Sequence, residues 1–301
     1  MRLGIFARTF VRASFEETFD AVRSCGLECL QFNFSCAGMP TLPEVIDPAL
    51  AHRIRMELEK RSLTMAAASG TCNLIHPDPA HRAQCLARLR LMIAGCRELG
   101  TSIVTLCTGT RDATDMWRSH RENDSPEAHR DLRISLEGLL QTAEEHSVRL
   151  GIEPEPANVI ASAQQARLLL DDLKSPCLKI IFDGANLLAA HGLSEQERIL
   201  SEAVHLLGPD IILAHAKDLS QKASVMTVAA GAGALDYSLI LSLLKRAGFD
   251  EVVVLHSLAE AEVPSSVAFL RAHLNRVSKE SPGNAKSRQD AKSRQDAKMP
   301  R

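Results

Sequence analysis

The sequence predicts a (β/α)₈ barrel, or TIM barrel, from the rhythm of its apolar residues. Short apolar runs alternate with longer stretches of helical periodicity, and eight such pairs fit into the 301 residues. A TIM barrel typically needs about 250 residues. A doubly wound sheet that binds a nucleotide normally carries a glycine-rich turn after its first strand. Here the first predicted strand continues into Ala-Arg-Thr-Phe, so the barrel is the favoured fold.

The predicted strands are mostly continuous apolar runs without strict alternation. This pattern is typical of strands that are buried on both faces of a parallel sheet. The eight strands are Leu3–Phe6, Cys29–Phe32, Thr64–Ala68, Ile103–Cys107, Arg149–Glu153, Lys179–Phe182, Ile211–His215 and Val252–Leu255.

Three of the intervening helices have clear boundary signals. Pro79–Leu99 has leucines at helical spacing and is followed by Gly100. Ser125–His146 opens with Ser-Pro-Glu, which supplies a cap, a proline in the first turn and an acid near the helix N-terminus. Leu235–Ala247 has the same plan and ends before Gly248.

The C-terminal segment differs from the rest of the chain. Residues 1–278 carry the barrel pattern, whereas residues 279–301 are polar and contain the hexapeptide AKSRQD twice in succession. Because this segment has almost no apolar surface to bury, we expect it to be disordered and exclude it from the fold.

Charge and composition narrow the function classes. The net charge is −2, from 35 basic and 37 acidic residues, so a nucleic-acid partner is not expected. No apolar run approaches the roughly 20 residues that span a bilayer, and the N-terminus lacks a signal-peptide pattern. We therefore expect a cytoplasmic protein with no membrane partner, and its eight scattered cysteines should be reduced.

Four consecutive predicted strands end in potential metal ligands. Glu153 ends the fifth strand, Asp183 follows the sixth, His215 ends the seventh and His256 follows the eighth. In a TIM barrel the carboxyl ends of the strands carry the functional residues. Each residue alone could be a cap, a turn residue or a structural histidine, but turns do not require all four together. Mixed carboxylate and imidazole ligands suit Mn²⁺, Fe²⁺, Co²⁺ or Zn²⁺ better than Ca²⁺.

Other polar residues near the strand ends are candidates for substrate binding. Lys217 could hold an anionic substrate oxygen or neutralise Asp218, and Glu155 and Asp218 could support the ligands or face solvent. Trp117, the only tryptophan, could cover the substrate as part of a lid or pack on the barrel rim. The remaining candidates, each of which could instead cap a loop, are Gln31, Asn33, Asn73, His76, Thr108 and Thr110.

With these motifs, the chain resembles the xylose isomerase-like TIM-barrel superfamily, in its sugar phosphate isomerase/epimerase group. The resemblance covers about residues 1–277. The matching stretches are Ile152-Glu153-Pro154, Asp183-x-x-Asn186, His215-Ala-Lys217-Asp218, Gly231-Ala-Gly233-Ala-Leu-Asp236, Gly248-Phe-Asp250, Asn73-Leu-Ile-His76-Pro-Asp78 and Ala94-Gly-Cys-Arg-Glu-Leu-Gly100.

The resemblance implies one divalent metal ion, with Mn, Co, Zn, Fe and Mg all open, held by Glu153, Asp183 and His215. It also implies a substrate that presents a carbonyl and an adjacent hydroxyl to that ion. Two residues depart from the family pattern. His256 stands where the family has a second glutamate, and Asn186 stands where a histidine is usual.

These features favour an isomerase or epimerase that transfers a proton next to a carbonyl on a small sugar, keto-sugar or polyol derivative. Glu153 is then ligand and candidate base, His256 a ligand or proton shuttle, and Lys217 a further catalytic candidate, while Asn186 could orient a substrate hydroxyl. The partner is a small carbohydrate, and a homo-oligomer is possible.

Three alternatives stay open at this stage. The missing second carboxylate also suits a metal-dependent dehydratase or lyase acting on a keto-sugar or inosose. It equally suits a barrel that binds sugar without catalysis. An endonuclease that cleaves DNA at abasic sites is less favoured, because it needs more ligands and a basic groove.

Overall fold

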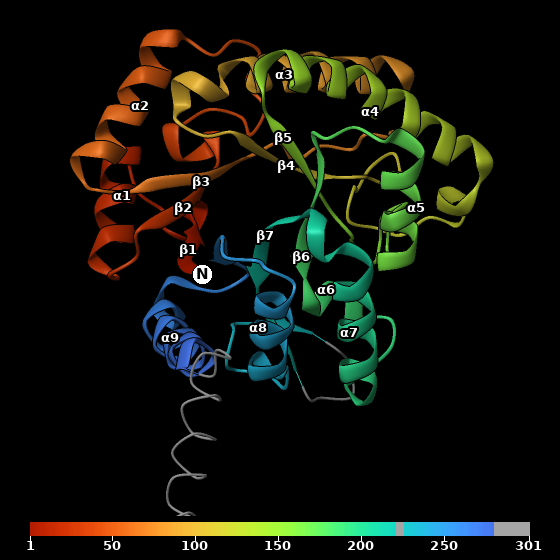
Figure 1. Ribbon diagram of the computed structural model, residues 1–301. Coiled ribbons are helices and arrows are strands. Elements are labelled where there is room, and N and C mark those ends of the chain that lie inside the picture. The colour runs from red at the N-terminus through yellow and green to blue at the C-terminus, as the bar shows by residue number, and fades with distance from the viewer. Residues whose placement is uncertain (221–225, 280–301) are drawn as a thin grey trace, which may run out of the picture.

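A computed structural model describes residues 1–220 and 226–279 of the chain. Its centre is a closed barrel of parallel strands in the order β1-β10-β7-β6-β5-β4-β3-β2, which confirms the predicted TIM barrel (Figure 1). The barrel strands are β1 (Arg2–Phe6), β2 (Cys29–Phe32), β3 (Thr64–Ser69), β4 (Ile103–Cys107), β5 (Arg149–Glu153), β6 (Leu178–Asp183), β7 (Ile211–Ala216) and β10 (Val252–Leu255).

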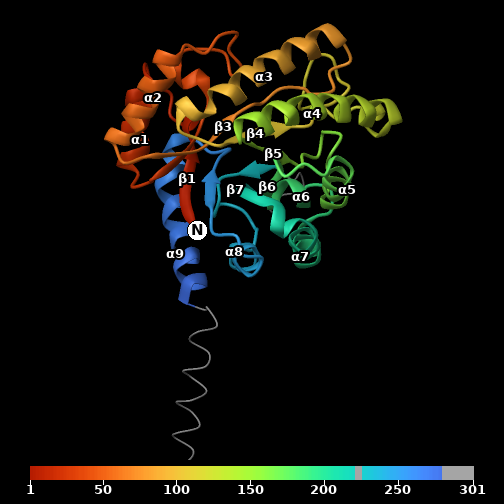
Figure 2. The ribbon, with the colours of Figure 1, turned by 45° about the horizontal axis from the view of Figure 1, so that its top comes forward.

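The helices lie outside the barrel and cover its strands (Figures 1 and 2). The α-helices are α1 (Phe15–Ser24), α2 (Pro48–Lys60), α3 (Pro79–Leu99), α4 (Pro126–His146), α5 (Ala163–Leu173), α6 (Gly184–Leu188), α7 (Gln196–Leu207), α8 (Tyr237–Arg246) and α9 (Val263–Lys279). Short 3₁₀ turns occur at Ala7–Thr9, Phe34–Ala37, Arg121–Asp124, Leu193–Glu195, Gly208–Asp210 and Glu260–Glu262.

Local capping chemistry explains where these helices begin. Asp78 and Ser125 accept hydrogen bonds from the first turns of α3 and α4, and a proline follows each cap, as predicted for Ser125. The predicted start of α8 at Leu235 is wrong by two residues. The Asp236 side chain accepts from the backbone N–H of Leu239, so Asp236 is the cap and the helix begins at Tyr237.

The barrel interior changes character from one end to the other. Nine buried apolar residues from the strands fill a small core of their own: Cys29, Ala66, Ala67, Ile103, Ile181, Ile212, Leu213, Val252 and Val254. Polar side chains replace them toward the carboxyl ends of the strands, where Gln31, Ser69 and Thr105 are buried. This change places a polar floor beneath the loops that follow the strands.

Strand register brings the predicted ligands to one level. Asp183 pairs with His215 between β6 and β7, and His215 pairs with Val254 of β10, two residues before His256. On the other side, Glu153 pairs with Cys107 of β4. The parallel register therefore gathers residues that are far apart in the sequence.

A short hairpin not expected from the sequence follows β7. It consists of β8 (Asp218–Leu219) and β9 (Thr227–Val228), which pair antiparallel. Helix α9 continues to Lys279, and the predicted tail beyond it lies outside the described residues. No helix within the described residues is long and apolar enough to cross a membrane. All eight cysteines are free.

Candidate metal centre

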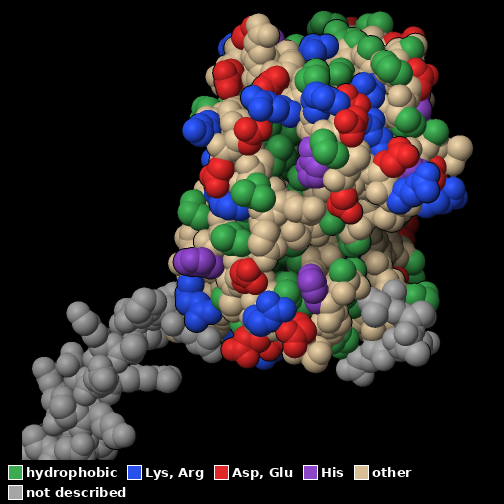
Figure 3. All heavy atoms as spheres, turned by 90° about the vertical axis from the view of Figure 1, so that its right-hand side faces the viewer, with side chains coloured by type: hydrophobic (Ala, Val, Ile, Leu, Met, Phe, Trp, Pro, Cys, Tyr) green, Lys and Arg blue, Asp and Glu red, His purple; other side chains and the backbone are tan. Residues whose placement is uncertain are grey.

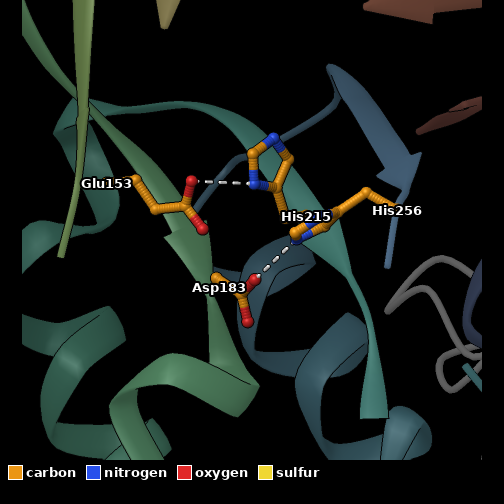
Figure 4. Close-up of side chains that lie close together, drawn as sticks. All are labelled: Glu153, Asp183, His215 and His256. Atoms are coloured by element: carbon orange, nitrogen blue, oxygen red, sulfur yellow. Dashed lines mark hydrogen bonds and ion pairs between the residues drawn. The ribbon is translucent and has the colours of Figure 1, made fainter. Parts of the chain in front are cut away.

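Glu153, Asp183, His215 and His256 converge at the carboxyl end of the barrel (Figure 4). They come from β5, β6 and β7 and from the residue that follows β10. Each offers one potential ligand atom, and these atoms all lie within 4.8 Å of one another. The first three side chains are buried and His256 is half-buried. The structure thus brings together all four residues that the strand ends singled out.

The two oxygens of Asp183 have different roles. Oδ1 accepts from the backbone N–H groups of Ala185 and Asn186, at 2.9 and 3.2 Å, and so caps α6. Oδ2 lies 3.1 Å from Lys217 Nζ and 3.3 Å from His256 Nε2. The cap fixes the carboxylate, and Oδ2 stays directed at the cluster.

Glu153 is held in a similar way by a side chain of α6. Its Oε1 accepts from Asn186 Nδ2 at 2.9 Å, and its Oε2 lies 3.1 Å from His215 Nδ1. This second contact lies within ion-pair distance but is not aligned as a hydrogen bond, so the buried His215 Nδ1 has no hydrogen-bond partner in the described structure. The other ring nitrogen, Nε2, lies 2.8 Å from Gln31 Oε1.

Burial and charge oppose each other at both carboxylates. Burial raises the pKa of Glu153, but His215 and Lys217 outweigh it, and the pKa falls below its ordinary value. Burial also raises the pKa of Asp183, yet Lys217 and His256 lower it by more. Both groups are therefore anionic near neutral pH, which is the state that binds a cation.

The pKa values of three neighbouring groups are shifted as well. Burial acts to lower the pKa of Lys217, but Asp183 and Glu153 raise it overall, so the ammonium keeps its charge. Burial, followed by the charge of Glu153, raises the pKa of Glu155 to about 8. Burial and the nearby His215 lower the pKa of His256, which favours a neutral imidazole.

A cavity of about 550 Å³ opens above the cluster. Glu153, His215 and His256 form part of its wall together with Glu155 and Lys217. The other lining residues are Phe6, Arg8, Thr9, Gln31, Thr71, Thr105, Leu106, Cys107, Trp117, Ser257 and Leu258. A volume of this size suits a small polar ligand.

The predicted substrate-binding residues divide into two groups. Trp117 and Lys217 line the cavity, and Asn186 reaches the site through Glu153. Lys217 contacts Asp183, whereas Asp218 accepts from the backbone N–H groups of Leu219, Gly231 and Leu235 and anchors the loop before α8.

Asn33, Asn73, His76 and Thr108 are not among the described residues that line the cavity. Asn33 accepts from Ser35 N, and Thr108 Oγ1 accepts from Ile160 N. Asn73 bonds to both backbone groups of Thr110, and His76 Nε2 lies 3.2 Å from Ala113 O. These four side chains therefore stabilise the loops at the rim of the barrel through contacts with loop backbone.

Several lining residues were not predicted from the sequence. The polar ones each lie within three residues of the end of a barrel strand; they are Arg8, Thr9, Thr71, Thr105 and Ser257. Only their position near a strand end could have marked them as lining residues, because the carboxyl ends of the strands and the loops after them face the site in this fold. Ser257 also has a left-handed backbone, with φ of 58°, which directs the chain away from β10.

The chemistry of these side chains fits a divalent cation. Two anionic carboxylates and two imidazoles form a set typical of transition metals. The unpaired, buried Nδ1 of His215 faces a carboxylate oxygen, an arrangement that a cation between the two atoms would satisfy. The Lys217 ammonium contacts the same cluster through Asp183, so a bound cation would share that carboxylate with it.

Comparison with known families agrees with the fold and the strand-end motifs. The family model for the xylose isomerase-like TIM barrel matches residues 19–273. The chain belongs to this family. The resemblance inferred from the sequence is thereby confirmed. Comparison with curated protein sequences finds no significant match.

Several solved structures share the fold at low sequence identity. A D-tagatose 3-epimerase-like protein superposes with a TM-score of 0.73 at 17% identity, over 93% of this chain and 99% of that one. An L-ribulose 3-epimerase gives 0.71 at 17% identity, over 93% and 96%. A protein named IOLI, crystallised with a zinc atom, gives 0.68 at 16% identity, over 92% and 98%.

Proposed function

We propose that this xylose isomerase-like barrel is a metal-dependent isomerase or epimerase. It would transfer a proton next to a carbonyl on a small sugar, keto-sugar or polyol derivative. The observation that carries the proposal is the convergence of Glu153, Asp183, His215 and His256 within 4.8 Å at the floor of a cavity. The sugar epimerases of similar fold support the same reaction class.

The metal would be one divalent ion, with Mn, Co, Zn, Fe and Mg as candidates. The mixed ligand set favours a transition metal, and one structural neighbour was crystallised with zinc and another with magnesium. When bound, the ion would act as a Lewis acid on the substrate carbonyl.

The side chains of this protein would then carry the proton. Glu153, anionic and open to the cavity, would accept it from the carbon next to the carbonyl. His256 lines another part of the wall and would return a proton as the second acid/base group. Lys217 would hold an anionic substrate oxygen, and Asn186 would keep Glu153 in place.

A dehydratase or lyase acting on a keto-sugar or inosose is the second candidate. It is favoured by His256, because an imidazole opposite a carboxylate supplies one acid and one base, as an elimination requires. A sugar-binding barrel without catalysis is a third candidate. An abasic-site endonuclease is least favoured, because it needs more ligands than these four and a basic groove, whereas the net charge is −2 and basic and acidic side chains are interspersed on the side of the molecule shown in Figure 3.

The test combines metal analysis with isotope exchange. Metal-free protein is reloaded with each candidate ion and incubated with a panel of ketoses in deuterated water. We expect metal binding and deuterium next to the carbonyl for the wild type, and loss of both for Glu153→Gln. Glu155→Gln, which alters a neighbouring wall carboxyl outside the ligand cluster, should keep the metal.

Each outcome discriminates between the candidates. A protein that binds no transition metal and gains no stability from any of them contradicts the proposal. A dehydrated product identifies the lyase, and sugar binding without exchange or turnover identifies the binding barrel. Nicking of abasic DNA would identify the endonuclease.

A further inference from the structure

Gln31 links β2 to the opposite side of the barrel through a buried hydrogen-bond network. Its side chain is almost fully buried. Its Nε2 donates to Ser69 Oγ on β3 at 2.9 Å and to Thr105 Oγ1 on β4 at 3.2 Å. Its Oε1 lies 2.8 Å from Nε2 of His215, on β7. The amide therefore joins four strands at the level of the metal centre.

This network decides which ring nitrogen of His215 carries the proton. The structure places the Nε2 of the Gln31 amide against the two hydroxyls and its carbonyl oxygen against His215. A carbonyl oxygen can only accept a hydrogen bond. The proton of a neutral His215 ring must then lie on Nε2, and Nδ1 carries a lone pair.

The lone pair on Nδ1 has an unusual neighbour. Nδ1 is buried, makes no hydrogen bond within the described structure, and lies 3.1 Å from Glu153 Oε2. While the ring is neutral, this lone pair and the carboxylate oxygen repel one another, and burial keeps water from separating them. A cation placed between them would turn the repulsion into two favourable contacts.

We propose that Gln31 is a positioning residue that acts through His215. It holds the imidazole in the tautomer protonated on Nε2 and so presents Nδ1 to the cation shared with Glu153, Asp183 and His256. A hydrogen bond to the distal nitrogen is the usual device for orienting a metal-binding histidine. The tautomer assignment stands on the geometry alone, whereas its consequence for metal binding rests on the proposed function.

The tautomer is measured first, on metal-free wild-type protein. Long-range ¹⁵N–¹H correlation spectra distinguish the two neutral forms of a histidine, and a His215→Gln variant identifies the signals of this ring. We expect the proton on Nε2. A proton on Nδ1, either in a neutral ring beside a reversed amide or in a doubly protonated ring, would mean that Nδ1 donates to Glu153, and the inference would be overturned.

Metal affinity is measured next, by titration with Co²⁺ and Zn²⁺. Gln31→Leu removes the acceptor and should weaken binding about 10–100-fold, the range found when such supporting groups are lost. Gln31→Glu keeps an acceptor at the same place and adds a negative charge, so it should bind the ion at least as tightly as the wild type and keep the wild-type Co²⁺ absorption spectrum. Ser69→Ala removes one partner of the amide but leaves Oε1, and it should change the affinity far less.

The outcomes separate this inference from the proposed function. If Gln31→Leu binds metal as tightly as the wild type, the positioning role is wrong while the metal site stands. If the wild type shows the Nε2–H tautomer but binds no metal, the proposed function fails and only the tautomer assignment survives. The spectrum of the wild type decides the first step even if Gln31→Leu does not fold.

Discussion

Lys217 is the cation that the protein itself supplies to the cluster, and its removal gives a specific expectation. Its Nζ lies 3.1 Å from Asp183 Oδ2, and both side chains are buried. In Lys217→Met the aliphatic volume remains and the charge is lost. Among the described residues, Asp183 would then keep its contacts with His256 and with the backbone N–H groups at the start of α6. We expect the metal-free variant to be less stable than the wild type.

The magnitude follows from the burial of the pair. Removing one partner of a buried ion pair costs about 3–5 kcal/mol, because the other charge is left uncompensated. The two backbone hydrogen bonds to Oδ1 place the expected loss near the lower end, about 3 kcal/mol. A divalent ion should recover much of this loss, since it replaces the missing charge and no longer meets the repulsion of the ammonium.

Urea unfolding with and without metal provides the assay. A ligand present at 100 times its dissociation constant stabilises the folded state by about 2.7 kcal/mol. In Lys217→Met we expect the metal to bind at least about tenfold more tightly than in the wild type, which adds about 1.4 kcal/mol. The free energy of unfolding should therefore rise more on metal addition in the variant.

A second lysine offers a matched control. Lys179 pairs with Asp210 at 2.7 Å, but that pair is partly exposed and far from the cluster along the strand. Lys179→Met should cost at most about 1 kcal/mol, and metal should not restore it. If metal-free Lys217→Met is as stable as the wild type, or if metal stabilises both proteins equally, the charge argument is refuted.

Three further expectations concern other parts of the molecule. A Cβ on Gly233 would lie 2.3 Å from Asp218 Oδ1, so Gly233→Ala should lower the free energy of unfolding by about 1–3 kcal/mol in urea. Burial raises the pKa of Asp210, but Lys179 lowers it overall, so this carboxylate contributes stability above its unfolded pKa of about 3.9. That contribution is lost as the pH falls through the lower pKa of Asp210 in the folded state. The difference in free energy of unfolding between the wild type and Asp210→Asn should therefore vanish at that pH. A difference that does not change with pH would contradict this expectation. Trp117 lines the cavity and is 52% exposed, so Trp117→Ala should weaken sugar binding roughly fivefold, or about 1 kcal/mol, with an unchanged urea midpoint. Because the chain has one tryptophan, its fluorescence in the wild type reports the binding directly, and a ligand that leaves this emission unchanged would contradict the placement.

The parts of the fold that depend on local sequence were predictable. Helix α3 was predicted with its observed ends, because Asp78, Pro79 and Gly100 act within the helix's own terminal turns. The hairpin β8–β9 was missed, because two-residue strands carry no periodicity. The true start of α8 depended on which of two adjacent residues, Leu235 or Asp236, capped the helix, and only the hydrogen bond to Leu239 decides it.

The residues of the candidate site were likewise predictable only in part. Glu153, Asp183, His215 and His256 were identifiable because each ends a strand, and a closed parallel barrel brings strand ends together whatever their spacing in the chain. The roles of Asn73, Thr108 and Asn33 were not identifiable, because a polar residue after a strand can face either the cavity or its own loop. Their partners show that these side chains bond to loop backbone.

The sequence by itself determined the barrel, its family and the four potential ligands, because periodicity and strand ends are properties of neighbouring residues. Tertiary structure alone decided how those ligands are held. The contact between Gln31 and His215 joins residues 184 positions apart, and the pairing of Lys217 with Asp183 instead of Asp218 depends on how β6 and β7 lie in register. Such contacts follow from the closure of the barrel, which no stretch of the sequence records.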